Sequence, residues 1–242
     1  MSRKKIVIIL LLILAALTAA YFIFFGPSLP SMLKKPVIQG PKGLASFGFE
    51  EPGALKKWEE KIFKGRVIYS VNKSKNNSYL NAYSKSSASG IVHWLKFNPK
   101  EKPMVRWKWK VTRFPAKPSV GSSASGWLEK EDYAARFYII FPKFPFFRLQ
   151  CLEYIWSEDL PLNTVITNQS FGNLKLIVVE SGAKKLGQWV SVERNIYEDF
   201  KRAFGSQPPQ AGAIAIMTNA NNSNSTAEAQ YDEIEVGYAK QP

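Results

Sequence analysis

Alternation of side chains with a period of two is the feature that most constrains the fold of this chain. In MVRWKWKV, residues 104–111, valine and tryptophan alternate with arginine and lysine. Successive side chains of a strand point to opposite faces, so Trp107 and Trp109 are predicted to face a core while Lys108 faces solvent. About ten such stretches, separated by polar or Pro/Gly turns, follow residue 66. The pattern predicts a β-sandwich or barrel rather than βαβ units.

Two short helices are expected beside the strands. In RNIYEDFKRAFG, residues 194–205, Asn195 is a predicted N-cap, Glu198 completes a capping box, and Gly205 ends the helix. The stretch GALKKWEEKIF, residues 53–63, has apolar residues at helical spacing and predicts a short amphipathic helix.

The N-terminal segment differs from the rest of the chain. Three basic residues precede an uncharged apolar run of 20 residues, Ile6–Phe25. At 1.5 Å per residue such a helix spans about 30 Å, the thickness of a bilayer core. A cleaved signal peptide is the alternative, because Ala19 and Ala20 are small residues, but the apolar run continues past them. The sequence favours an uncleaved signal anchor.

This interpretation divides the chain into three parts. Residues 1–25 are the predicted signal anchor or transmembrane helix, residues 26–45 a linker rich in Pro and Gly, and residues 46–242 one exported β-sandwich domain. The basic flank is expected to stay in the cytoplasm, which places the domain in a periplasm or outside the cell. The single cysteine, Cys151, allows no internal disulfide and is expected to be a buried apolar residue.

The formal net charge of +14 indicates which partners are expected. A positive surface favours anionic glycans or lipid headgroups, and a protein partner is a further alternative. Nucleic acid is not expected, because no helix-turn-helix, zinc or single-strand-binding signature is present. The aromatic and basic stretch at residues 141–150 is a candidate contact with a membrane interface or a partner. The alternative for this stretch is packing beneath the neighbouring sheet, and the alternative for the net charge is a solubilising surface without a specific partner.

The residues offer little for catalysis. His93 is the only histidine, and it alternates with apolar residues, as a residue on a strand face does. A hydrolase triad or a usual catalytic metal site is therefore not expected. A glycosidase needs two facing carboxylates, and the sequence does not pair Asp132, Glu153, Glu180 or Glu193. No catalytic residue and no cofactor is predicted.

Arg136 is the first candidate ligand-binding residue, because it interrupts the apolar strand YAARFYIIF. If its guanidinium is buried it requires an acid, for which Asp132, Glu153 and Glu180 are candidates. The alternative is a concave binding face that Arg136 shares with Tyr154, Trp156 and Arg194, where flat rings and fixed donors suit a sugar or an acidic group.

Several blocks together resemble a known bacterial family. VRWKWKV, DYAARFYIIF, VVESGAKKLGQWVSVERNIYEDFKRAFG and IAIMTNANNSNSTAEAQYDEIEV occur in an order similar to that of domain of unknown function 3047, over roughly residues 46–238. The resemblance implies an exported single-domain β protein but no activity. The closing YDEIEV is similar to the last strand of galactose-binding-like jelly rolls. We therefore expect a β-sandwich of jelly-roll type.

The tract after residue 218 departs from that family. The family tends to have an acid-rich turn, whereas this chain has Asn219 and Asn221 there, so a cation role for the turn is in doubt. We expect a loop between the last two strands, and both asparagines are candidate ligand contacts on its rim. The parity of apolar residues changes near Asp232, which predicts a bulge. Asp232 is also a candidate ligand for a structural calcium ion.

The sequence favours a non-catalytic module that binds an envelope glycan or another anionic ligand. A carboxylate-dependent enzyme acting on glycans is one alternative, and an accessory subunit that docks on another membrane or envelope protein is another. The ligand, the host and the oligomeric state do not follow from the sequence.

Overall fold

The computed structural model describes residues 45–74, 77–116, 132–143 and 148–238. The predicted membrane segment, residues 6–25, lies outside these ranges, as does the linker up to residue 44 and the centre of the aromatic stretch, residues 144–147. Among the residues that are described, no helix is long and apolar enough to cross a membrane.

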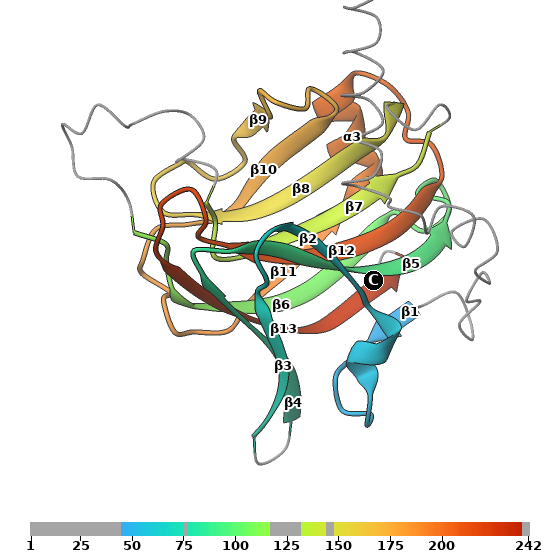
Figure 1. The fold of residues 1–242 in the computed structure, drawn as a ribbon. Helices are drawn as coiled ribbons and strands as arrows, with labels where there is room; N and C mark the ends of the chain where they lie inside the picture. The colour runs from blue at the N-terminus through green and yellow to red at the C-terminus, as the bar shows by residue number, and fades with distance from the viewer. Residues whose placement is uncertain (1–44, 75–76, 117–131, 144–147, 239–242) are drawn as a thin grey trace, which may run out of the picture.

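The described part of the chain forms a β-sandwich of two sheets, as the alternating pattern predicts (Figure 1). One sheet has six strands in the order β11-β6-β13-β4-β3, with β1 also paired to β13. The other has seven strands in the order β2-β5-β12-β7-β8-β10-β9. The strands of the first sheet are β1 (Ala45–Phe47), β3 (Ile68–Ser74), β4 (Asn77–Lys85), β6 (Met104–Arg113), β11 (Val190–Asn195) and β13 (Thr226–Gly237). Those of the second are β2 (Glu59–Lys64), β5 (Ala88–Phe97), β7 (Arg136–Phe141), β8 (Gln150–Ser157), β9 (Val165–Thr167), β10 (Leu174–Ser181) and β12 (Ala211–Asn219).

The last two strands of the chain lie inside the two sheets. β12 pairs with β5 on one side and β7 on the other, and β13 pairs with β4 and β6. All of these pairs are antiparallel, whereas β8 and β10 are parallel. Each sheet is therefore completed by a strand that comes late in the sequence.

Aromatic side chains fill the space between the sheets. Trp107 and Trp109 on β6 are buried, as their alternation predicts. The ring of Trp107 stacks on Phe137 of β7 at a centroid distance of 4.5 Å, and Trp109 contacts Trp156 of β8 at 6.2 Å. The inward faces of the two sheets thus form one core.

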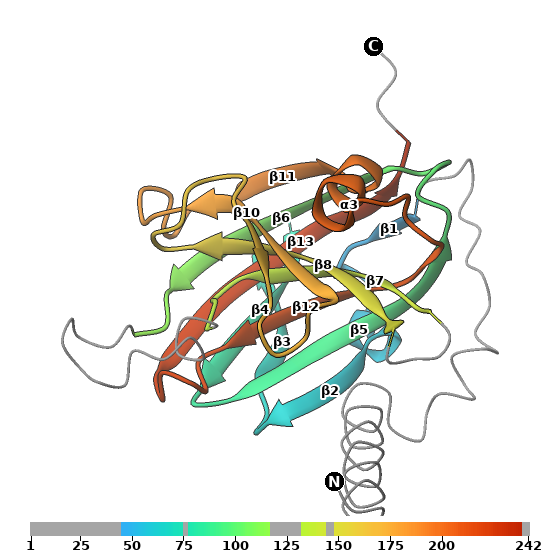
Figure 2. The same ribbon diagram turned by 90° about the horizontal axis from the view of Figure 1, so that it is seen from above.

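The predicted helix after residue 195 is confirmed as α3 (Ile196–Phe204), which lies at one end of the sandwich beside β11 (Figure 2). Asn195 Oδ1 accepts hydrogen bonds from the backbone N–H groups of Tyr197 and Glu198, and Gly205 ends the helix at φ +67°. Phe200 is buried against Phe141 of β7, so α3 closes this end of the core.

The helix predicted at residues 53–63 is wrong. A single 3-10 turn, η3 (Ala54–Lys57), is followed after Trp58 by β2. Pairing of β2 with β5 satisfies backbone groups along one side of this stretch, and that tertiary contact outweighs the helical spacing of its apolar residues. Ile62, which was expected on the apolar face of that helix, is exposed on β2.

The bulge predicted near Asp232 is confirmed. The register between β13 and β6 shifts between Asp232 and Glu235, and Glu233 has a φ of +47°. The shift turns Ile234 and Val236 toward the core after Tyr231 has occupied it.

Candidate functional site

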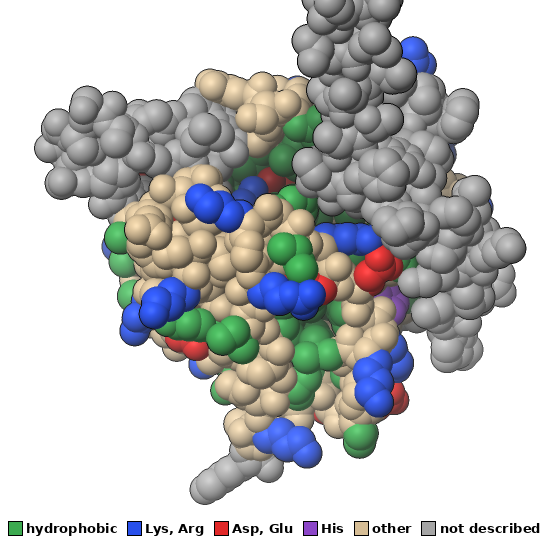
Figure 3. Space-filling model, in the orientation of Figure 1, with side chains coloured by type: hydrophobic (Ala, Val, Ile, Leu, Met, Phe, Trp, Pro, Cys, Tyr) green, Lys and Arg blue, Asp and Glu red, His purple; other side chains and the backbone are tan. Residues whose placement is uncertain are grey.

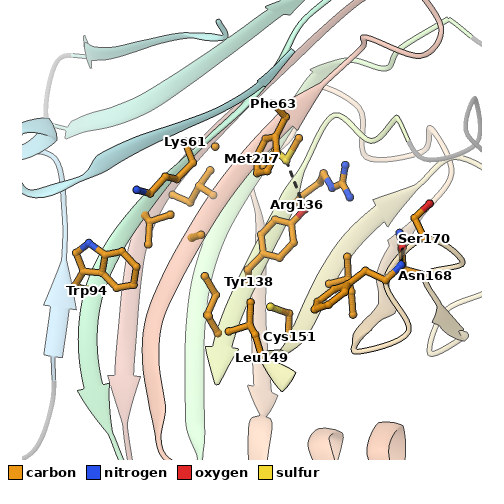
Figure 4. Close-up of a pocket in the computed structure, with 17 residues that line it drawn as sticks. Lys61, Phe63, Trp94, Arg136, Tyr138, Leu149, Cys151, Asn168, Ser170 and Met217 are labelled. Atoms are coloured by element: carbon orange, nitrogen blue, oxygen red, sulfur yellow. Dashed lines mark hydrogen bonds between the residues drawn. The ribbon is translucent and has the colours of Figure 1, made fainter. Parts of the chain in front are cut away.

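A groove lies on the outer face of the seven-stranded sheet (Figure 4). Its volume is about 390 Å³, and residues of β2, β5, β7, β8, β10 and β12 line it together with the loop between β9 and β10. Apart from Ile216, the strand side chains that line the groove have the parity opposite to that of the core residues on the same strands. The groove is therefore a second surface of the sheet and not an extension of the core.

The floor of the groove is formed by small side chains on the inner strand β12. Ala215 points outward and lines the groove, and it packs with Ala213 of the same strand and with Val92 and Ile140 of the neighbouring strands. Because alanine is short, the sheet surface at Ala215 is lower than at Trp94 of β5 and Tyr138 of β7. This difference in side-chain size produces the trough.

Aromatic rings border this trough on several sides. Trp94 of β5 lies at one end of the view in Figure 4, and Tyr138 of β7 lies near its centre. Both side chains are half-buried, whereas Phe63 of β2 is exposed and Phe171 from the loop before β10 is half-buried. Trp94 and Tyr138 are two strands apart, which corresponds to about 10 Å across the sheet. Flat apolar surfaces are thus spaced along an open groove.

A carboxylate holds Trp94 in place. Glu59 Oε2 accepts a hydrogen bond from the indole Nε1–H of Trp94 at 2.8 Å, and Glu59 Oε1 forms an ion pair with Lys61 Nζ at 2.5 Å. Both oxygens of Glu59 are therefore used, one to orient the ring and one to neutralise the lysine at the groove.

Arg136 contributes the second cation of the groove. Its Nε–H donates to Glu153 Oε1 at 2.5 Å, and both side chains are buried. The guanidinium carbon lies 5.5 Å from the ring centroid of Tyr133 and 5.7 Å from that of Tyr138. Of the acids considered from the sequence, Glu153 is the partner, so the predicted ion pair is confirmed. Glu153 Oε2 has no hydrogen-bond partner among the described residues.

The Arg136 side chain also reaches the loop after β12. Its Nη1–H donates to Asn219 Oδ1 at 2.8 Å, and Asn219 Nδ2–H donates to Asp132 Oδ1 at 2.6 Å. Asp132 Oδ2 then accepts hydrogen bonds from both the backbone N–H and the hydroxyl of Ser223, each at 2.7 Å. A chain of side chains thus joins the groove to the asparagine-rich loop.

Burial decides the protonation of the groups around the groove. Burial raises the pKa of the Tyr138 phenol well above its ordinary value, and it also raises the pKa of the Cys151 thiol, with a further increase from the charge of Glu153. Burial lowers the pKa of Arg136, but the carboxylate of Glu153 and the hydroxyl groups of Tyr138 and Tyr133 together raise it above its ordinary value. Tyr138 and Cys151 are therefore neutral and Arg136 is charged at neutral pH.

Sequence comparison identifies the family. The family model described as "Protein of unknown function (DUF3047)" matches residues 56–235, which include every strand of the groove. The chain belongs to the DUF3047 family. No curated protein gave a match.

Structures similar to this DUF3047 protein have low sequence identity to it. The family 30 carbohydrate-binding module of a Clostridium thermocellum cellulosomal cellulase is 8% identical, with 76% of this chain and 93% of that chain covered and a TM-score of 0.40. The cleaved adhesin domain K1 of Lys-gingipain from Porphyromonas gingivalis W83 is 12% identical over 81% and 98%, with a TM-score of 0.39. The xylan-binding domain CBM22-1 from Paenibacillus barcinonensis is 12% identical over 84% and 99%, with a TM-score of 0.37. These values are too low to transfer a ligand to the DUF3047 chain.

The concave face predicted for Arg136, Tyr154 and Trp156 is not formed. The register pairs Arg136 with Ile155 and Phe137 with Tyr154, so Arg136 points to the groove while Tyr154 and Trp156 point into the core. Both rings are fully buried and present no surface to a ligand.

Arg194 does meet Tyr154, but at the end of the sandwich beside α3. Arg194 Nε–H and the hydroxyl of Tyr154 both donate to Asp199 Oδ2, at 2.8 and 3.0 Å. This cluster ties α3 to the sheets, and it is separate from the residues that line the groove.

The two candidate asparagines hold the loop together. Asn219 bridges Arg136 and Asp132, and its amide also donates to Asn221 Oδ1 at 3.2 Å. Neither residue lines the groove. Asn219 thus bonds mainly to residues outside the turn, whereas Asn221 bonds to Asn219 and Asn222.

Asp232 lies on the outer face of the other sheet. Its Oδ2 accepts a hydrogen bond from Asn77 Nδ2–H at 2.7 Å, and burial raises its pKa above the ordinary value. Within the described ranges, no group of three or more His, Cys, Asp or Glu side chains could hold a metal ion.

His93 is buried on the core side of β5, where its Nδ1–H donates to the carbonyl of Lys57 at 3.0 Å.

Sequence reasoning missed most of the groove. The sequence does not single out Trp94, Tyr138, Lys61 or Phe171. The alternation within a strand shows which side chains face outward, but it does not show whether that face is open to solvent or covered by another segment. One signal was present in GAIAIMT: outward-facing alanines alternate with inward-facing isoleucines on a strand that lies inside a sheet. Small side chains on an interior strand indicate a depression in the sheet surface.

Proposed function

We propose that this DUF3047 protein binds a carbohydrate chain in the groove on the outer face of the seven-stranded sheet, without catalysing its cleavage. The observation that carries the proposal is the placement of Trp94 and Tyr138 on either side of the alanine floor. An extended sugar chain presents apolar ring faces that pack on aromatic side chains, and hydroxyl groups that need fixed polar partners.

The polar groups around the rings support the same proposal. The groove is lined by the polar side chains of Lys61, Arg136, Asn168 and Ser170. Contacts with other protein groups fix Lys61, Arg136 and Asn168. Asn168 Oδ1 accepts the backbone N–H of Phe171 at 2.7 Å, which holds the loop against the groove. Side chains that are fixed before the ligand arrives lose little conformational entropy on binding.

The apolar run Ile6–Phe25 extends the proposal to location. We propose that it anchors the chain in a membrane with its N-terminus in the cytoplasm, and that the sandwich, of jelly-roll type, reaches envelope glycans from the far side. The linker that follows, up to residue 44, would act as a spacer between the bilayer and the domain.

The test is retention of the full-length protein on a panel of immobilised envelope and plant polysaccharides, with the soluble fraction analysed for products. Trp94→Ala and Tyr138→Ala are expected to lose retention by about tenfold or more, because each removes a stacking surface. Trp189→Ala is the matched control, since this exposed ring stands beside Tyr79 and Lys110 on the other sheet. Equal retention of all three variants and the wild type would contradict the proposal.

A further inference from the structure

The groove is electrically balanced although the chain is strongly basic. The formal net charge is +14, yet the charged side chains that line the groove are only Lys61 and Arg136 among the described residues. Each of them forms an ion pair with a carboxylate of the same sheet: Lys61 with Glu59 and Arg136 with Glu153. The two cations of the groove are thus matched by two acids.

The Lys61 pair is partly removed from water. The Lys61 side chain is 14% exposed and Glu59 is 30% exposed, so solvent screens this pair less than it screens a surface pair. Glu59 also accepts the indole N–H of Trp94. An anionic group that replaced Glu59 at Lys61 would release Trp94 from its fixed position, and it would bring two negative charges close together.

The Arg136 pair is more deeply buried. The guanidinium is held by Glu153 and Asn219 and is flanked by the rings of Tyr133 and Tyr138. A ligand carboxylate or phosphate at this guanidinium would compete with Glu153, whose side chain has no exposed surface. Removing water from the ligand anion while Glu153 remains charged and buried makes that exchange unfavourable.

The unbalanced positive charge lies on other surfaces. Lys and Arg side chains are spread over the face seen in Figure 3 in several separate places. Lys110, for example, lies over the rings of Tyr79 and Trp189 on the six-stranded sheet, at 5.7 and 5.1 Å. Such charges attract polyanions in a way that salt screens and that does not depend on the groove.

We infer that the groove selects uncharged carbohydrate, and that attraction of this basic protein to anionic polymers takes place outside the groove. This inference rests on the proposed carbohydrate binding and names the ligand class for the same site. The paired acids Glu59 and Glu153 are then specificity determinants: they hold the cations of the groove and repel ligand anions.

The experiment compares polysaccharides that share a backbone and differ in charge. The probes are hydroxyethyl cellulose against carboxymethyl cellulose, neutral xylan against glucuronoxylan, and dextran against dextran sulfate, each at low and high salt. For at least one pair, the full-length wild type is expected to retain the neutral member at high salt and to lose the anionic member by about tenfold or more. Trp94→Ala is expected to abolish only the salt-resistant retention.

Glu59→Gln tests the specificity directly. The amide oxygen can still accept the hydrogen bond from Trp94, but Lys61 loses its ion pair, so retention of the anionic member in the groove is expected to rise severalfold and to require Trp94. Glu193→Gln is the control of equal charge change, because it removes the partner of Arg106 on the outer face of the other sheet. This control is expected to raise anionic retention only at low salt and without dependence on Trp94.

The outcomes separate the ligand class from the proposed function. If the wild type retains an anionic member at high salt more strongly than its neutral partner, and Trp94→Ala abolishes this retention, the groove binds charged glycans and the inference is wrong while carbohydrate binding stands. An unchanged anionic retention in Glu59→Gln would overturn the role of that acid. If no polysaccharide is retained at high salt, both the inference and the proposed function fail.

Discussion

Arg136 and Asn219 are joined by a hydrogen bond of 2.8 Å that links the groove to the loop after β12. The guanidinium belongs to the outer face of β7, whereas Asn219 is the last residue of β12 and leads into the asparagine-rich turn. Asn219 Nδ2–H donates to Asp132, and Asp132 accepts a hydrogen bond from the backbone N–H of Ser223. A loop that is polar in composition is therefore anchored on one buried arginine.

Replacement of Asn219 should destabilise the fold. Asn219→Ala leaves Arg136 Nη1 and Asp132 Oδ1 each without one of their present partners in a buried region. We expect the free energy of unfolding to fall by about 1–3 kcal/mol, the cost of leaving buried polar groups unsatisfied. Urea denaturation followed by tryptophan fluorescence measures this change. Asn222→Ala is the control, because its side chain accepts only a hydrogen bond from Asn221; an equal loss in both variants would contradict the role of Asn219.

Removal of Arg136 should cost more than removal of the whole ion pair. Arg136→Met leaves the buried carboxylate of Glu153 without a countercharge, and we expect a loss of about 3–5 kcal/mol in the free energy of unfolding. Adding Glu153→Gln removes the uncompensated charge and should restore a large part of that loss. Denaturation of the two single variants and the double variant gives the coupling energy. If the double variant is no more stable than Arg136→Met, the uncompensated charge of Glu153 is not the cause of the lost stability.

Filling the alanine floor should block the groove without removing any ring. Ala215→Leu places a larger side chain between Trp94 and Tyr138, and we expect salt-resistant retention on the bound polysaccharide to fall by about tenfold or more. The added atoms point out of the sheet, so the melting temperature should change little. Ser191→Leu, an exposed position on β11 of the other sheet, is the control. Full retention by Ala215→Leu would place the ligand elsewhere.

Asp232 should make stability fall as the pH rises. Burial raises its pKa in the folded protein above the ordinary value of 3.8, so the folded state holds this proton more tightly than the unfolded state does. Where the unfolded chain has already lost the proton, the native state binds more protons, and the free energy of unfolding decreases with increasing pH from about 3.8 upward. Asp232→Asn removes this contribution. Urea denaturation across acidic pH should therefore show the variant gaining stability relative to the wild type as the pH rises; a constant difference would contradict this.

The sequence predicts the sandwich well because its signal is local. Alternation identifies the strands, Asn195 and Gly205 delimit the helix, and the change of parity reveals the bulge at Asp232. The pairing of strands is not local: nothing in the pattern of β8 indicates that it is parallel to β10. For the same reason residues 53–63 have helical spacing but from residue 59 onward form β2, since β5, which follows after two intervening strands, supplies the hydrogen bonds.

The site was predicted less completely than the fold. The sequence points to Arg136 because a charged residue in an apolar strand needs a partner, and Glu153 is one of the acids that it offers. Tyr154 and Trp156 were grouped with it by residue type, although strand register sends them to the opposite face. Tyr138 shares the face of Arg136 by parity, and only the arrangement of the two sheets shows that this face is open.

The position of β12 and β13 inside the two sheets sets the order in which the chain can fold. β5 and β7 come to lie on either side of β12, and β4 and β6 on either side of β13, yet both inner strands follow residue 210. A nascent chain that has emerged only to that point lacks the strand that joins the parts of each sheet, and non-local pairing of this kind is slow. The domain can therefore close only late in synthesis, once the residues from 211 onward are available to pair with strands made earlier.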